Sequence, residues 1–272
     1  MSRLRFAVVG DNCVDRFKSP VNQSLIGGNA VNVAVQLAAL GHEAFYFGAV
    51  GADADGRRTR EILVANGVRT DHLSILPGET AYTDIESTPS GDRVFAYESF
   101  GVCADYRPDA EALAVLASMD HVHLGWIRDR GLVRRAMAAA GTSVSQDLSV
   151  NNDPVHLGVE GLRIAFASAG EDRAAAERML ADLLSKGAAL AVVTRGGDGS
   201  TASDGSAVAD VGIRPVTVVD TTGAGDSFIA GFLGTFLAGG DLSLSLQAGR
   251  DCAARTCEHV GGFPQTPGRL EE

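Results

Sequence analysis

The stretch that most constrains the fold is residues 216–233, where an extended run, a glycine-rich turn and a helix follow one another. The run Val216–Val219 is β-branched throughout, which favours extended backbone. After the turn, large apolar residues recur at a spacing of three and four from Phe228 to Leu237, which is the period of a helix. An extended segment that leads into a helix through a short turn is typical of α/β folds.

The turn combines small residues with one carboxylate. Gly223, Ala224 and Gly225 come first, and Asp226 follows. Amide N–H groups at a helix start have no intrahelical partner, and the helix dipole adds partial positive charge, so the turn favours an anion such as a phosphate. A carboxylate at the same place repels such an anion. Two interpretations of Asp226 stay open from local chemistry: a partner for the helix dipole, or a general base beside a phosphate site.

The rest of the chain alternates strand-like and helix-like segments. With 272 residues, of which 45% are hydrophobic, it can bury one sizeable core in one or two domains. Buried strands are predicted at 6–9, 44–50, 121–124, 142–147, 164–168 and 190–194, and helices at 27–41, 53–67, 132–140, 172–184 and 242–259. The alternation predicts a doubly wound, mostly parallel sheet flanked by helices. Between Thr80 and Asp105 the pattern instead predicts a β-hairpin around a turn at 89–92.

Charge and cysteine usage exclude several classes of protein. The net charge of −11 argues against a nucleic-acid partner, which requires a basic face. The first apolar run, 6–9, is too short for a signal peptide or a membrane span. The four cysteines are scattered without C-x-x-C pairing, which is typical of reduced thiols, so we expect a cytoplasmic protein without a membrane partner. No G-x-G-x-x-G follows the first strand, which disfavours a nicotinamide dehydrogenase.

A second informative string opens the helix predicted at 27–41. Gly27 and Gly28 permit a close approach of the backbone to a ligand, and Asn29 and Asn32 lie three apart on one helix face, where two amides can meet hydroxyl groups. The alternative without a ligand is a loop that ends at the glycines, with Asn29 as the helix cap.

The string Asp220–Phe228 resembles the C-terminal signature of the ribokinase (PfkB-type) sugar kinase family, and Gly27–Gly41 resembles its N-terminal signature. The resemblance covers nearly the whole chain, with the elements in the family's order. It implies that Asp226 accepts the proton of a sugar hydroxyl. It also implies that the backbone of residues 223–226 forms the anion hole for the transferring phosphoryl group.

The resemblance extends to a nucleotide site for ATP with Mg²⁺. The segment 194–199 is similar to the family's nucleotide loop, which implies that Thr194, Gly196 and Gly199 approach ATP. Glu171 matches the glutamate that organises the water shell of Mg²⁺, whereas Ser168 stands where the family usually has asparagine. Without the resemblance, the loop is equally a tight hairpin turn and Glu171 a helix N-terminal charge.

On the acceptor side, Asp15 matches an aspartate near the first strand that contacts the sugar in the family, and Asp147 matches a polar position between sugar and phosphate. Arg93, in the predicted hairpin, is a candidate selector of the substrate, or else an ordinary solvated charge. The full set of implied acceptor contacts is Asp11, Asp15, Gly27, Gly28, Asn29, Asn32, Arg93 and Asp147.

The resemblance also implies a single ribokinase-like domain over 1–272, with a small β-sheet lid from about 16–26 and 80–106 and a nucleotide-binding part at about 160–272. In some relatives a monovalent cation such as K⁺ binds where Asp220 and Thr222 stand, and lids pair in homodimers.

Four strings, at 10–15, 27–35, 92–95 and 166–169, are most similar to the branch of the family that phosphorylates fructoselysine. The implied reaction is ATP-dependent transfer of the γ-phosphoryl group to the 6-hydroxyl of fructoselysine or a related Amadori compound. Fructose, ketodeoxygluconate or a nucleoside stay open as acceptors, and so does a catalytically silent binding protein.

Overall fold

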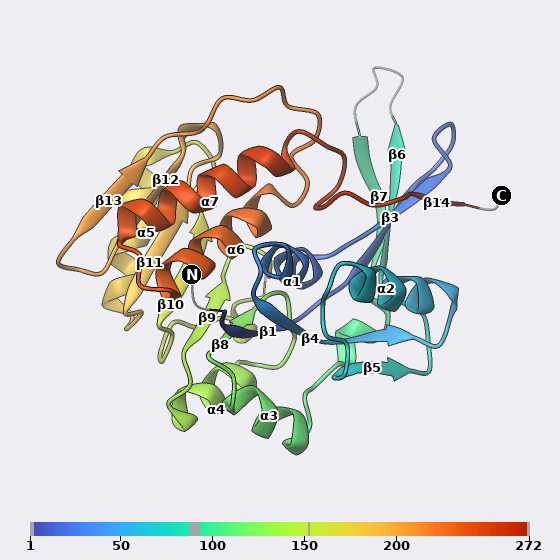
Figure 1. The fold of residues 1–272 in the computed structure, drawn as a ribbon, viewed down its shortest axis with the longest axis horizontal. Coiled ribbons are helices and arrows are strands. Elements are labelled where there is room, and N and C mark those ends of the chain that lie inside the picture. The colour runs from blue at the N-terminus through green and yellow to red at the C-terminus, as the bar shows by residue number, and fades with distance from the viewer. Residues whose placement is uncertain (1–2, 88–92, 152, 271–272) are drawn as a thin grey trace.

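The computed structural model describes residues 3–87, 93–151 and 153–270, which form a nine-stranded and a five-stranded sheet (Figure 1). The strand order of the large sheet is β13-β12-β11-β10-β9-β8-β1-β4-β5. Its pairs are parallel except those of β12 with β11 and β13. The strands are β1 (Arg5–Val9), β4 (Glu43–Gly51), β5 (Leu73–Leu76), β8 (His121–Leu124), β9 (Val144–Asp147), β10 (Ile164–Ser168), β11 (Leu190–Thr194), β12 (Ser200–Ser203) and β13 (Val208–Val211).

Helices cover both faces of the large sheet, because its strands are apolar on both sides. In β1, Phe6 and Val8 belong to one core cluster, and Ala7 and Val9 belong to the other. The first cluster includes residues of α1 (Asn29–Ala39), α2 (Ala54–Ala65), α6 (Ala224–Leu237) and α7 (Leu242–Thr256), and the second includes residues of α3 (Ala110–Ala117), α4 (Leu132–Ala140) and α5 (Arg173–Ser185). Short 3₁₀ turns lie at η1 (Gly101–Asp105), η2 (Pro154–His156) and η3 (Gly196–Asp198).

The small sheet stands beside the carboxyl ends of β1 and β4, with the order β14-β3-β2-β6-β7 (Figure 1). Its strands are β2 (Cys13–Phe17), β3 (Gln23–Gly27), β6 (Tyr82–Ser87), β7 (Arg93–Ser99) and β14 (Gly268–Arg269). Only β2 and β6 pair in parallel. Three distant segments of the chain therefore build this sheet together.

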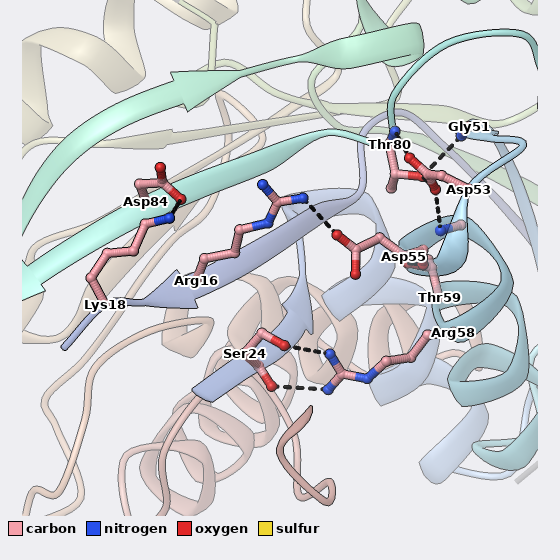
Figure 2. A network of polar contacts seen from close by, with 11 residues as sticks. Arg16, Lys18, Ser24, Gly51, Asp53, Asp55, Arg58, Thr59, Thr80 and Asp84 are labelled. Atoms are coloured by element: carbon pink, nitrogen blue, oxygen red, sulfur yellow. Dashed lines mark hydrogen bonds and ion pairs between the residues drawn. The ribbon is translucent and has the colours of Figure 1, made fainter. Parts of the chain in front are cut away.

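Polar contacts attach one face of the small sheet, the outer face that carries Arg16 and Ser24, to α2 (Figure 2). Arg16 on β2 forms an ion pair with Asp55 at 2.7 Å, and Arg58 donates to the hydroxyl and the carbonyl of Ser24 on β3 at 2.6 and 2.9 Å. Asp53 caps α2 by accepting from the amide of Gly56 and also accepts from the amide of Thr80, just before β6. The sheet is thus held to the first turns of one helix.

The expected doubly wound, mostly parallel sheet with a second small sheet is confirmed. One expectation was wrong in detail: α7 ends at Thr256 rather than at about 259. Val216–Val219, whose composition favours extended backbone, is not part of a strand, and Val216 and Val218 line a cavity. The contribution of β14 to the small sheet had no sequence signal, because a two-residue strand is too short to show periodicity.

Candidate active site

The site is organised by the start of α6, where glycine is required. Gly223 has φ +75°, and a Cβ atom on it would lie 2.4 Å from the Cα of Gly262. No other residue fits both the left-handed backbone and this contact. The helix α6 begins directly after this glycine, at Ala224. The amide of Ala224 donates to the carbonyl of Thr221 at 3.2 Å.

Asp226 lies in the first turn of α6 and points at the start of α1. Its two carboxylate oxygens accept from the side-chain amides of Asn29 at 2.6 Å and Asn32 at 2.7 Å. The helical spacing of three residues places both amides on one face of α1, and that face meets α6. The two signature strings, far apart in the sequence, therefore meet in one constellation.

Burial raises the pKa of Asp226 to about 7. The amide of Asn32, followed by that of Asn29, opposes the shift, and the negative charges of Asp147 and Asp11 add to it. A carboxylate with a pKa near neutrality combines substantial ionisation with useful basicity, as a general base requires.

Asp147, at the end of β9, shares Asn29 with Asp226. Its carboxylate accepts from the Asn29 amide at 3.1 Å and from the backbone and hydroxyl of Ser149 at 2.9 and 2.6 Å. Burial raises its pKa. Asn29 therefore joins the two carboxylates, and its own side-chain oxygen is buried without a partner.

Asp11 lies at the start of α1, where its carboxylate accepts from the backbone amides of Asn29 at 3.1 Å and Ala30 at 3.2 Å. Asp11 thereby caps the helix, because Gly28 at the N-cap position has no side chain. Gly28 has φ +103°, and a Cβ atom on it would lie 2.6 Å from the Cα of Asn12. Burial raises the pKa of Asp11 to about 6. The sequence predicted a substrate contact here; the capping geometry gives Asp11 a structural role in addition, and the substrate contact stays a prediction.

Asp15 lies on the inner face of the small sheet, defined here as the face that carries Asp15 and Gly27. A Cβ atom on Gly27 would lie 3.4 Å from Oδ2 of Asp15 and 3.8 Å from Oδ1 of Asn32. Burial raises the pKa of Asp15 to about 6. The missing side chain of Gly27 thus leaves room between the small sheet and the amides that hold Asp226.

A cavity of about 710 Å³ borders the turn. The three residues that the sequence assigned to the nucleotide, Thr194, Gly196 and Gly199, line it, and so does Glu171, which the sequence assigned to Mg²⁺. Ser168 and, from the turn, Ala224 and Gly225 line it as well. The volume is in the range of small-molecule sites. The start of α6 therefore belongs to both the cavity wall and the carboxylate cluster.

Asp220 ties the turn to the loop that follows α7 and also holds Thr222. The Asp220 carboxylate accepts from the amide and hydroxyl of Thr222 at 3.1 and 2.9 Å and from the amide of Gly261 at 3.0 Å. Arg93 begins β7, but its side chain lies outside the described residues, so its predicted role stays a prediction.

Some residues of the site carried no signal in the sequence. Gly262 packs against Gly223 and Asn32, and Gln36 donates to its carbonyl at 2.8 Å. Arg214 lines the cavity, and so do Phe228, from the signature string, and Arg250, from the helix predicted at 242–259. For Gly262, the hint in the sequence was a glycine pair after that helix, and it suggests a helix end rather than a site.

In the described part of the chain, no group of three or more histidine, cysteine or acidic residues is placed to hold a metal ion. Mg²⁺ keeps several waters and binds nucleotide phosphates, so a single carboxylate such as Glu171 on the cavity wall fits that ion. No helix among the described residues is long and apolar enough to cross a membrane.

Comparison with known proteins adds independent findings. The model of the pfkB family of carbohydrate kinases matches residues 18–148 and 153–267. Fructoselysine 6-kinase of Shigella flexneri is 38% identical over 94% of this chain and 98% of its own length. A fructosamine kinase of Bacillus subtilis is 30% identical over 99% and 96%, respectively. The structure of Arabidopsis thaliana ribokinase, complexed with ribose and ATP, superposes with a TM-score of 0.87 at 21% identity over 96% of this chain and 94% of that one.

Proposed function

The chain belongs to the pfkB family of carbohydrate kinases and is a phosphotransferase with an alcohol acceptor, and from this premise we propose that it transfers the γ-phosphoryl group of ATP to the 6-hydroxyl of fructoselysine. The 38% and 30% identical relatives, named for fructoselysine and fructosamine, support this acceptor. Fructose is the comparison substrate, because it offers the same hydroxyl without the amine.

One observation carries the mechanism: Asp226 directly follows Gly225 of the cavity wall, and both its oxygens are held by Asn29 and Asn32. The side-chain oxygen of Asn32 in turn lies near Gly27 on the inner face of the small sheet. Asp226 takes the proton of the acceptor hydroxyl as the oxygen–phosphorus bond forms. The bond to the bridging oxygen of ADP breaks, and ADP carries away the negative charge. Amides at the start of α6 stabilise the charge that spreads over the transferring group.

ATP occupies the cavity in this proposal, with Thr194, Gly196 and Gly199 along its phosphates. Glu171 would hold Mg²⁺ through water, and the ion supplies charge neutralisation of the phosphates. The small sheet acts as a lid that keeps water from competing with the sugar hydroxyl. The single-domain organisation, the monovalent cation at Asp220 and Thr222, and pairing of two copies through the lid stay predictions.

Asp226→Asn tests the proposal. We expect kcat on fructoselysine to fall at least about a hundredfold, because an amide accepts no proton from the hydroxyl, while the affinity for ATP stays within about twofold. A coupled assay of ADP release and calorimetric titration of ATP measure the two. Turnover that stays within about tenfold of the unmodified enzyme contradicts the role of Asp226 as base. Turnover of fructose but not fructoselysine contradicts the acceptor.

A further inference from the structure

An acidic row crosses the inner face of the small sheet. Asp15 on β2 pairs with Thr83 on β6, and Thr83 pairs with Glu98 on β7. Directly paired residues point to the same face, so the three side chains stand side by side across three strands. Neighbouring strands lie about 4.8 Å apart, which sets Glu98 about 10 Å from Asp15 along this row.

The site beside this row contains acceptors that need donors. Oδ1 of Asn32 is buried without a partner, and Asn32 is only 4% exposed. That oxygen and Oδ2 of Asp15 border the space left open by Gly27. A ligand that reaches this space must bring hydroxyl or ammonium hydrogens, because a buried acceptor without a donor is costly.

Charge on the inner face favours a cation. Burial is the main cause of the raised pKa of Asp15, and a hydrogen bond from Cys13 opposes it. The negative charges of Asp220, Asp11 and Glu98 raise this pKa further. The basic residues of β2 and the segment after it point to the outer face, where Arg16 pairs with Asp55 and Lys18 with Asp84 (Figure 2). Among the described residues, none forms an ion pair with the exposed Glu98.

We propose that Glu98 binds the cationic amine of the acceptor while Asp15 accepts from its hydroxyls, so that the small sheet selects amine-bearing sugars over neutral ones. The inference rests on the proposed function, because fructoselysine carries such an amine. Glu98 is a specificity residue here and takes no part in the transfer of the proton or the phosphoryl group.

The test compares fructoselysine with fructose in the full-length enzyme and in Glu98→Gln. We expect the kcat/KM for fructoselysine, divided by that for fructose, to fall about fivefold in the variant, mainly because KM for fructoselysine rises. A fall of this size corresponds to the loss of one partly exposed ion pair. Added salt should raise the KM for fructoselysine in the unmodified enzyme and less in the variant. Glu98→Asp should restore part of the ratio.

Glu86→Gln is the matched control, since Glu86 is an exposed carboxylate on the same hairpin, three residues after Thr83, and therefore on the outer face. It should leave both substrates unchanged. Suppose that the unmodified enzyme uses fructoselysine. If Glu98→Gln then leaves the ratio of the two kcat/KM values unchanged, or lowers kcat/KM equally for both substrates, the role of Glu98 is overturned and the proposed function is not. An unmodified enzyme that uses fructose but not fructoselysine overturns this inference and the proposed function together.

Discussion

At the scale of single residues, burial and the two side-chain amides of α1 set the pKa and the orientation of the Asp226 carboxylate. An isolated carboxylate at a helix start is stabilised by the helix dipole and stays ionised. Here burial raises its pKa, and the amides of Asn29 and Asn32 fix both oxygens in place. The position of this carboxylate and its basicity therefore have different origins: the amides orient it and oppose the rise in pKa, and burial causes the rise.

The pKa of Asp226 makes a prediction for the pH dependence of catalysis. The base must be ionised, and its folded-state pKa is about 7, so kcat/KM should fall about tenfold per pH unit as the pH drops below 7. The negative charge of Asp147 contributes to the raised pKa, so Asp147→Asn should move the profile to lower pH.

A pH–rate profile of both forms measures this, and the apparent pKa belongs to the coupled carboxylates rather than to one residue. A rate that is constant between pH 5.5 and about 8 contradicts an essential base that titrates near 7.

At the scale of the element, the start of α6 works because its two glycines have different functions. Gly223 is required by its backbone and by the neighbouring Gly262. Gly225 has open space where a Cβ atom would stand, and that space belongs to the cavity. One glycine therefore shapes the turn, and the other leaves room for the ligand.

Alanine variants should separate these two functions. Gly223→Ala should lower the free energy of unfolding by about 2 kcal/mol, because it combines strain at positive φ with a contact too short for any Cβ atom. Gly225→Ala should keep or slightly raise stability, because alanine favours the helix, but it should raise the KM for ATP. Denaturant unfolding and steady-state kinetics measure both. Equal stability of the two variants contradicts the assignment.

At the scale of the whole molecule, the proposed acceptor site is built by both sheets. Asp226 and the amides belong to helices on the large sheet, whereas Asp15 and Gly27 belong to the small sheet. The position of the small sheet relative to α2 therefore decides whether the acceptor contacts meet, and Arg58 holds that position by two bonds to Ser24 (Figure 2).

Arg58→Leu should raise the KM for the acceptor about fivefold and leave the KM for ATP unchanged, because no residue of α2 lines the cavity that we assign to ATP. Arg57→Leu is the control, since Arg57 is the exposed neighbour on the same helix. Steady-state kinetics with each substrate varied in turn measures the effect. Equal changes in both KM values would argue against a local role for the Arg58 contacts.

By itself, the sequence determined the elements and the chemistry available to them. The periodicity of hydrophobic residues and the positions of glycines predicted the alternating strands and helices. The turn before α6 predicted an anion site with a carboxylate beside it. These features depend on neighbours a few residues apart, which is why they could be read directly. The roles inferred for single residues needed, in addition, the resemblance to a kinase family.

Only the tertiary structure decided what those residues do to one another. Asn29 lies 197 positions from Asp226, and Gly262 lies far from Asn32, so no local pattern connects them. The capping role of Asp11, the contribution of β14 and the row from Asp15 to Glu98 arise in the same way. A pKa depends on burial and on nearby charges, which exist only in the folded chain. For that reason the carboxylate of the turn could be recognised from the sequence, but its raised pKa, near neutrality, comes from the fold.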